Sequence, residues 1–245
     1  MYRHWAAYYL KSSLDRFPSL YLAGLRIKHR GRGFLKRIVS PATDICIEGH
    51  NRSANSFAVK AFRGANDSPE KEHVIATHVH ASAQVRRAVD LGIPTMVLIR
   101  EPKATVMSQK ALAIQLKQVA NPEAYPMAIF LAMYVDFYER LLPSKDGYMV
   151  ASFEQVTKDF GSVIERFNAR FETDFNGIDH TQEKEADIFQ QSRVHLSPSP
   201  ERQAIKDQLN TEMGELEASG YMKDACRVYK EFSASAEKSY DGFTF

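Results

Sequence analysis

The sequence TDICIEGHNRSANSFAVKAF, which spans Thr43 to Phe62, changes its pattern twice along its length. Two β-branched isoleucines flank Cys46 in a short apolar run that predicts a buried strand. A small polar turn follows, and three of its residues are suited to cap a helix: Ser53, Asn55 and Ser56. The apolar positions after the turn have helical spacing and include Phe57 and Phe62. A strand, loop and helix in this order direct backbone N–H groups and the helix dipole at an anion.

This loop differs from the nucleotide-kinase P-loop, G-x-x-x-x-G-K-S/T, at the positions that contact ATP. Counted from Gly49, the second glycine is replaced by Ala54 and the lysine by Asn55, while Ser56 keeps the hydroxyl. Arg52 adds a fixed charge with a planar set of donors, which suits phosphate or sulfate oxygens. From these residues alone, an anion-binding loop and an ordinary strand-to-helix turn are both open.

The composition favours one α/β domain over residues 1–245. The chain has 245 residues, of which 44% are hydrophobic, and this is enough to bury a sizeable core. The sequence has neither a run of eighteen apolar residues nor a readable secretory signal, so we expect a cytoplasmic protein without a membrane span. Cys46 and Cys226 are far apart and belong to no Cys/His cluster, so we expect neither a disulfide framework nor a metal site.

Residues 1–40 form a basic, amphipathic N-terminal arm in which nine Lys or Arg residues face one acid, Asp15. The arm's apolar residues recur at helical spacing and are interrupted near Pro18. We expect a helical arm docked on its own domain. Contact with an anionic membrane surface, an acidic partner or an anionic substrate is also open. Because no nucleic-acid reader motif accompanies the charge, we expect no nucleic-acid partner.

Two further segments place polar residues at the predicted carboxyl ends of strands. Residues 73–79, HVIATHV, predict a strand after which His78 and His80 share one side. Open α/β sheets bind ligands at that edge, where a histidine can take a proton from a hydroxyl at neutral pH. The apolar run 94–99, PTMVLI, predicts a strand buried on both faces. Arg100 follows it, and Ser108, about two helical turns further on, can reach the same anion.

Together these segments resemble the PAPS-dependent sulfotransferase family, in which PAPS is 3'-phosphoadenosine 5'-phosphosulfate. The family's first motif, P-K/R-S-G-T-S/T-F/W, is similar to residues 51–57, NRSANSF. Its second motif, R-D/N-P-R/K-D-x-x-x-S, is similar to residues 100–108, REPKATVMS, with the Arg-to-Ser spacing kept. The sequence departs from the first motif at Asn51, which replaces proline, and at Ala54, which replaces a glycine.

The resemblance implies a three-layer, P-loop-like α/β fold with a largely parallel central sheet flanked by helices. It implies PAPS as donor, PAP (3'-phosphoadenosine 5'-phosphate) as product and no metal. The residues that it places around the 5'-phosphosulfate are Asn51, Arg52, Ser53, Ala54, Asn55, Ser56 and Phe57. It places Arg100 and Ser108 on the 3'-phosphate, and Arg52 would also stabilise charge on the leaving phosphate.

Weaker similarity extends the expected site. Residues 148–160, YMVASFEQVTKDF, resemble a later family segment and place Phe153 near the adenine, while SPSPERQ at 197–203 makes Arg202 a candidate cofactor residue. The T-H of the family's K-T-H-L-P recurs in Thr77 and His78, so His78 is the expected base. His80 is the alternative, and an acidic base such as Glu48 also stays open.

The sequence therefore predicts a sulfotransferase that moves a sulfuryl group from PAPS to a hydroxyl or amine. The acceptor, a small molecule, carbohydrate or lipid, and the oligomeric state are not readable from the sequence. A small-molecule kinase is one alternative, because the loop is P-loop-like. A catalytically silent nucleotide-binding or scaffold protein is another, because the loop is altered at Ala54 and Asn55.

Overall fold

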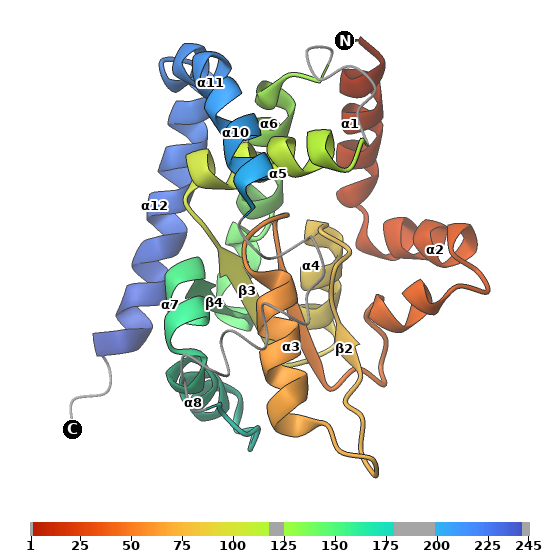
Figure 1. Cartoon of the computed structure of the whole chain (residues 1–245). Coiled ribbons are helices and arrows are strands. Elements are labelled where there is room, and N and C mark those ends of the chain that lie inside the picture. Colours follow the sequence, from red (N-terminus) through yellow and green to blue (C-terminus); the bar gives the residue numbers. More distant parts are fainter. Residues whose placement is uncertain (1, 118–124, 179–198, 242–245) are drawn as a thin grey trace.

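The computed structural model describes residues 2–117, 125–178 and 199–241 (Figure 1). Within these ranges the centre is a parallel sheet in the order β2-β1-β3-β4. The strands are β1 (Ile45–Gly49), β2 (Ile75–Ala76), β3 (Thr95–Ile99) and β4 (Met149–Ser152). Helices cover both faces, so the expected three-layer α/β fold with a parallel central sheet is confirmed.

Different helices cover the two faces, because successive residues of a strand point to opposite sides. Ile47 and Leu98 pack on one face and Val97 and Val150 on the other. The first face is covered by α3 (Asn55–Asn66), α7 (Phe153–Lys158) and α8 (Phe160–Phe171). The helices of the second face include α4 (Ser82–Asp90), α6 (Met127–Glu139) and α12 (Gly220–Asp241). A short 3-10 helix, η2 (Leu142–Gly147), leads from α6 into β4.

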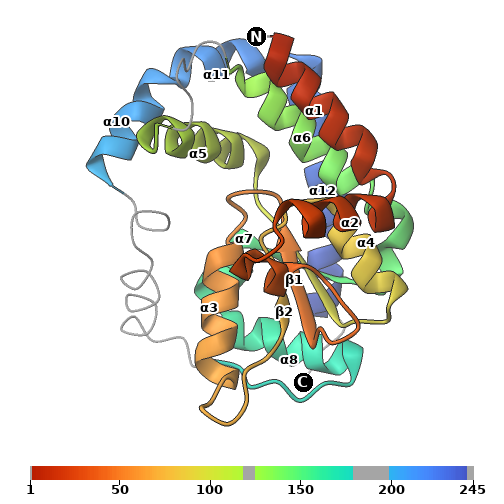
Figure 2. The ribbon, with the colours of Figure 1, turned by 90° about the vertical axis from the view of Figure 1, so that its right-hand side faces the viewer.

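Further helices lie beyond the carboxyl ends of the strands (Figures 1 and 2). They are α5 (Pro102–Gln115), α10 (Pro200–Gln208) and α11 (Asn210–Glu217). Glu101 caps α5 by accepting hydrogen bonds from the backbone N–H groups of Lys103 and Ala104, as a carboxylate at a helix N-terminus should. Because α5 follows β3 directly and α10 packs on α5, these helices wall the edge where ligands bind in parallel sheets.

The second strand is much shorter than predicted. It was expected over residues 73–79 but covers only Ile75–Ala76. The chain leaves the sheet because the Thr77 N–H donates to the Arg37 carbonyl (3.0 Å) and the Val79 N–H donates to the buried Glu48 carboxylate (2.9 Å). His78 and His80 then take positive φ angles of 57° and 51°, so the predicted extended geometry is wrong for this pair.

None of the three predicted cap residues caps α3. The N-cap is Ala54, with a φ of 71° and no side-chain hydrogen bond to the helix. The predicted capping side chains are engaged elsewhere: Ser53 lies beside Tyr138, Asn55 donates to the His50 carbonyl and Ser56 pairs with His78. The left-handed backbone at Ala54 is the conformation that a glycine favours, which accounts for the glycine at this position of the P-loop pattern.

The N-terminal arm contains α1 (Tyr2–Asp15), α2 (Pro18–Lys28) and the 3-10 helix η1 (Gly33–Arg37). Asp15 joins it to the domain, because this residue is only 6% exposed and its carboxylate accepts hydrogen bonds from Ser82 Oγ, the Ala83 N–H (2.9 Å) and Arg140 (3.1 Å). Across the described ranges, no helix combines the length and apolar character needed to cross a bilayer.

Gly49 fits the end of β1 because it has no side chain. A Cβ added there would lie 2.5 Å from the Leu98 carbonyl oxygen on the neighbouring strand. We expect Gly49→Ala to lower the free energy of unfolding by about 1–3 kcal/mol through overpacking, measured by urea denaturation. In the matched control, Gly64→Ala in α3, a Cβ meets no atom within 4 Å. That control should be neutral or stabilising, and equal destabilisation of both variants would contradict the packing argument.

Candidate active site

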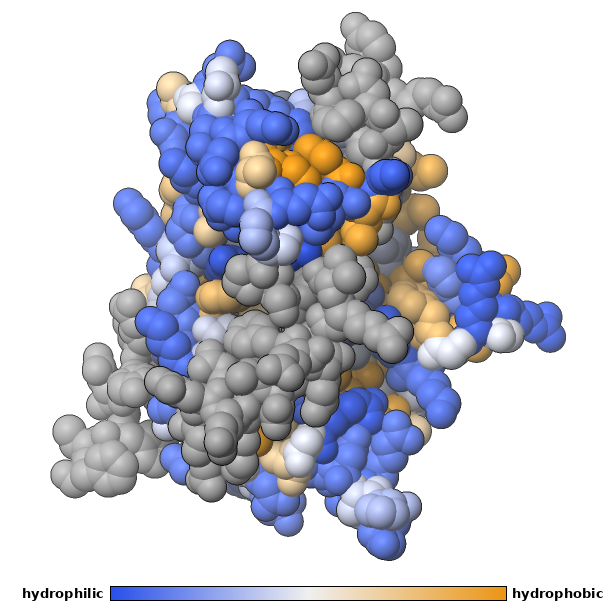
Figure 3. All heavy atoms as spheres, viewed as in Figure 1, coloured by the Kyte–Doolittle hydropathy of each residue, from blue (hydrophilic) through white to orange (hydrophobic). Residues whose placement is uncertain are grey.

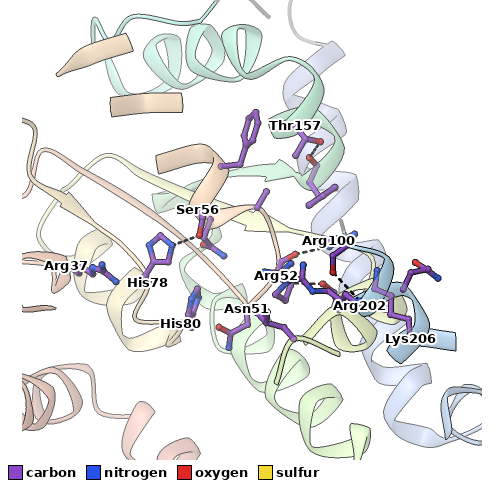
Figure 4. Close-up of a pocket in the computed structure, with 18 residues that line it drawn as sticks. Arg37, Asn51, Arg52, Ser56, His78, His80, Arg100, Thr157, Arg202 and Lys206 are labelled. Atoms are coloured by element: carbon purple, nitrogen blue, oxygen red, sulfur yellow. Dashed lines mark hydrogen bonds between the residues drawn. The ribbon is translucent and has the colours of Figure 1, made fainter. Parts of the chain in front are cut away.

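A cavity of about 760 Å³ lies at the carboxyl edge of the sheet (Figure 4). Its cationic side chains come from four separate parts of the chain: Arg37, Arg52, Arg100, Arg202 and Lys206. No Asp or Glu is among the described residues that line it. A cavity walled by one sign of charge concentrates ligands of the opposite sign, so its occupant should be a polyanion.

The loop between β1 and α3 forms one end of the cavity. The His50 carbonyl accepts hydrogen bonds from the Ser53 N–H (3.3 Å) and from the Asn55 side-chain amide (3.0 Å), which closes the loop on itself. Arg52 and Ala54 both have a φ of 71°, so the loop turns twice through left-handed backbone. The N-terminus of α3 opens toward the cavity, where its first N–H groups suit an anion.

Most of the loop residues expected to bind a cofactor line this cavity: Asn51, Arg52, Ala54, Asn55, Ser56 and Phe57. Ser53 is the exception, because its fully buried hydroxyl lies 3.3 Å from that of Tyr138. The Tyr138 hydroxyl in turn donates to the Leu98 carbonyl (2.7 Å). The Ser53 side chain therefore belongs to the interior, and only its backbone is available for a cofactor role.

Arg52, Arg100 and Ser108 meet although they come from the loop, the end of β3 and α5. Arg52 Nε donates to Ser108 Oγ (2.9 Å), and Arg100 Nη1 donates to the Arg52 carbonyl (3.2 Å) (Figure 4). The Arg100 guanidinium also lies over the Phe153 ring, 3.9 Å from its centroid. Stacking on an aromatic ring orients a guanidinium plane, so these contacts hold Arg100 ready for an anion.

The opposite wall comes from α10. Arg202 is only 4% exposed, and its Nε donates to Gln115 Oε1 on α5 (2.9 Å). Lys206 and Arg37 also line the cavity, and neither was predicted as a site residue. Lys206 lies four residues after Arg202, so helical spacing alone places it on the same face. For Arg37 no such signal exists, because it reaches the cavity only through the way the N-terminal arm is docked.

The positively charged side chains of this cavity repel one another, which disfavours their charged forms. Burial, and then the charges of Arg202 and Arg100, lower the pKa of Arg52 to about 10. Burial and the neighbouring arginines likewise lower the pKa of Lys206. Like charges that share a partly desolvated cavity repel, and an anion bound between them removes that repulsion. The charge arrangement therefore favours a bound polyanion over an empty cavity.

His78 is held at both ring nitrogens. Its Nε2 lies 2.9 Å from Ser56 Oγ, and its Nδ1 lies 2.9 Å from Thr77 Oγ1. Burial, followed by the nearby His80, lowers the pKa of His78 to about 4. It is therefore neutral at pH 7, with both nitrogens engaged by hydroxyl groups. Neither ring nitrogen of His78 is therefore without a hydrogen-bond partner.

His80 is arranged differently, with a carbonyl and a carboxylate on one side of its ring. Its Nδ1 lies 2.8 Å from the Gly49 carbonyl oxygen and 3.3 Å from Glu48 Oε1. Both partners are acceptors, so Nδ1 carries a hydrogen, and in the neutral form of the ring the lone pair would lie on Nε2. Among the described residues Nε2 has no hydrogen-bond partner, and the ring lines the cavity.

Glu48 is fully buried beneath His80. Burial alone would raise the pKa of Glu48, but the hydrogen bond from the His80 ring, the positive charge that His80 and His78 carry when protonated, and the hydrogen bond from the Val79 N–H lower it overall. The Gln84 amide also donates to this carboxylate (3.1 Å). A buried, ionised carboxylate behind an imidazole fixes its tautomer and stabilises its protonated form. The described residues contain no group of three or more His, Cys, Asp or Glu placed to hold a metal ion.

Comparison with known proteins gives a structural likeness. No protein-family model matches this chain, and no curated protein matches it. Among solved structures the chain is similar to mouse sulfotransferase SULT7A1 complexed with PAP, with 14% identity and a TM-score of 0.42. The likeness covers 83% of this chain and 93% of the mouse chain.

Proposed function

We propose that this protein is a sulfotransferase that moves a sulfuryl group from PAPS to a hydroxyl or amine and releases PAP. The observation that carries the proposal is a cavity walled by Arg52, Arg100, Arg202 and Lys206 without a lining carboxylate among the described residues. PAPS fits such a cavity because it bears anionic groups at both its 3' and 5' positions. The sequence resemblance supports the same assignment.

The two ends of PAPS would meet different parts of this cavity. The loop residues and the N-terminus of α3 would receive the 5'-phosphosulfate, with Arg52 beside the oxygen that becomes charged. Arg100 and Ser108 would hold the 3'-phosphate, and Arg202 and Lys206 face the same space from α10. Phe153 would border the adenine. The Arg100 guanidinium already lies over the Phe153 ring.

Within this proposal His80 is the base in preference to His78, because Nε2 of His80 has a lone pair available. When PAPS is bound it supplies the sulfuryl group. The acceptor oxygen or nitrogen gains a bond to sulfur, and the bond from sulfur to the 5'-phosphate oxygen breaks with its electron pair leaving on PAP. His80 Nε2 takes the acceptor proton, and the Glu48 carboxylate stabilises the imidazolium that forms.

Two features favour PAPS over Mg²⁺-ATP. The position of the P-loop lysine is Asn55, whose amide nitrogen donates to the His50 carbonyl within the loop. Carboxylates that hold Mg²⁺ in phosphoryl-transfer sites have no counterpart among the described residues that line the cavity. The cavity instead has several arginine and lysine side chains, which suit a donor that carries a 3'-phosphate.

We expect PAP to stabilise the folded protein strongly. At about a hundredfold excess over its Kd, PAP should raise the free energy of unfolding by about 2.7 kcal/mol. For a chain of this size that corresponds to a Tm increase of about 5–10 °C by differential scanning fluorimetry. ADP, which lacks the 3'-phosphate, should give a clearly smaller increase. A larger shift with Mg²⁺-ATP than with PAP would instead indicate a kinase.

Turnover separates the enzyme from a silent binding protein. Radiolabelled PAPS should transfer label to at least one member of a panel of carbohydrates, lipids, phenols and amines. PAP-dependent stabilisation without transfer to any acceptor class, and without slow hydrolysis of PAPS, would indicate a nucleotide-binding protein with no transferase activity. Release of PAP in proportion to the labelled product would establish the balance of the reaction.

A further inference from the structure

The exposed apolar side chains of this protein gather in the N-terminal arm. Nine large hydrophobic side chains are exposed in the described ranges, and seven of them lie between Tyr9 and Leu35. Ile27 is 77% exposed and Leu20 is 61% exposed, values unusual for aliphatic side chains in regular helices. Scattered exposed apolar residues need no explanation, but a cluster on one segment marks an interaction surface.

Helix α2 has a second apolar side besides the one that packs on the domain. Tyr21 and Leu22 are buried in the core. Leu20 and Ile27 are exposed and seven residues apart, which puts them on one side of the helix. Only Ala23 and Gly24 lie between them on that side, and both are exposed. The exposed side is therefore an apolar stripe along the whole helix.

Helix α1 and the turn after it extend this apolar character. Leu10, Leu14 and Phe17 are exposed and follow at the spacing of one helical side. α1 and α2 lie next to each other on the face turned toward the viewer in Figure 2. In the space-filling view, α2 projects from the body and shows apolar atoms beside hydrophilic ones (Figure 3).

The charged residues around this apolar stripe have one sign. The exposed basic residues of the arm include Arg16, Lys28, Arg30, Arg32 and Lys36. Asp15, the sole acid in residues 1–40, is buried and accepts hydrogen bonds from Ser82, Ala83 and Arg140. The exposed surface of the arm therefore combines large apolar side chains with basic side chains that no acidic residue of the arm neutralises.

We propose that this arm surface, made of Leu10, Leu14, Phe17, Leu20, Ile27 and the exposed basic residues around them, binds the surface of an anionic lipid bilayer. The apolar side chains would enter the boundary between headgroups and acyl chains while the basic side chains reach lipid phosphates. A second copy of this chain is a poorer occupant, because its positive arm would repel this one. The apolar residues of this surface, and its basic residues Arg16, Lys28, Arg30, Arg32 and Lys36, do not line the cavity, so its binding is independent of the sulfotransferase assignment.

The test is flotation of the whole protein with lipid vesicles. In about 100 mM salt, vesicles containing about one quarter phosphatidylglycerol in phosphatidylcholine should bind at least about tenfold more protein than phosphatidylcholine alone. Leu20→Gln/Ile27→Gln should reduce binding to anionic vesicles at least about tenfold. Lys28→Glu/Arg30→Glu should do the same through charge.

Matched variants keep this test specific. Val74→Gln changes an exposed apolar residue outside the arm, and Lys158→Glu/Lys223→Glu changes two exposed lysines elsewhere. Both should bind like the wild type, and circular dichroism and PAP-dependent stabilisation should be unchanged in all variants. The proposal is overturned by equal binding to neutral and anionic vesicles, by no binding, or by wild-type binding of the Leu20/Ile27 variant. A dimer seen by light scattering, dispersed by that variant without vesicle binding, would assign the surface to a second copy.

Discussion

Arg100→Ala should weaken PAP binding about a hundredfold, because removal of one partner of a desolvated charge pair costs about 2–5 kcal/mol. Arg100 is positioned before any ligand arrives, by the Phe153 ring at 3.9 Å and by the Arg52 carbonyl at 3.2 Å. Little ordering is then left to occur when the anion binds, so most of its interaction contributes to affinity. Isothermal titration calorimetry with PAP measures the loss directly.

Two further variants define what Arg100 contributes. Arg100→Lys keeps the charge but loses the planar donors and the stacking, so its affinity should fall between those of the wild type and the alanine variant. Arg170→Ala is the matched control, because within the described residues that exposed arginine donates to the Asp146 carbonyl, stacks on Phe171 and does not line the cavity. Unchanged PAP affinity in Arg100→Ala would remove Arg100 from the 3'-phosphate site.

His80→Ala should lower sulfuryl transfer by a factor of about 10²–10⁴, the usual contribution of a general base. PAP affinity should stay close to that of the wild type, since the imidazole is proposed to act on the acceptor. The reason is geometric: the Gly49 carbonyl and Glu48 hold Nδ1, and Nε2 has no hydrogen-bond partner among the described residues. Single-turnover transfer from radiolabelled PAPS measures the chemical step separately from binding.

His78→Ala provides the comparison for His80. The substitution should lower the rate of transfer by less than about tenfold. The reason is that His78 is hydrogen-bonded to Ser56 and Thr77, so we expect it to affect the reaction only by positioning the loop. The pH dependence gives an independent check, since a base works only when deprotonated and the rate rises with pH through its pKa. An acid limb near pH 4 would point to His78, whose pKa burial lowers to about 4. A large loss in His78→Ala with full activity in His80→Ala would reverse the assignment.

Local patterns in the sequence were sufficient for the parts of the site that lie close together along the chain. The loop from Asn51 to Phe57 follows a strand and opens a helix, as the change from an apolar run to helical spacing predicts. Arg100 and Ser108 are joined by the first turns of α5, so their spacing already placed them on one side. The parallel sheet followed from apolar runs that alternate with helical patterns.

Other features depend on contacts between distant residues, which no local pattern contains. Glu48 bonds the Val79 N–H across 31 residues, and this ends β2 early and turns the histidines out of the predicted extended geometry. Ser53 faces Tyr138, 85 residues away, and so leaves the predicted set of cavity side chains. Arg37 is held beside the cavity because its carbonyl accepts hydrogen bonds from Thr77 and Gln84, and the sequence shows Arg37 only as one of several basic residues.

The sequence alone was thus enough to specify the strand–loop–helix unit and the placement of Arg100 and Ser108 around the start of the next helix, because these depend on residue type and short-range spacing. Only the tertiary structure shows that the rings of His78 and His80 have different hydrogen-bond partners. Both histidines occupy the same short segment, and what separates them is the Glu48 carboxylate and Gly49 carbonyl of a neighbouring strand. A hydrogen-bond partner determines which nitrogen of an imidazole is free to accept a proton, and that partner is set by strand pairing across the sheet.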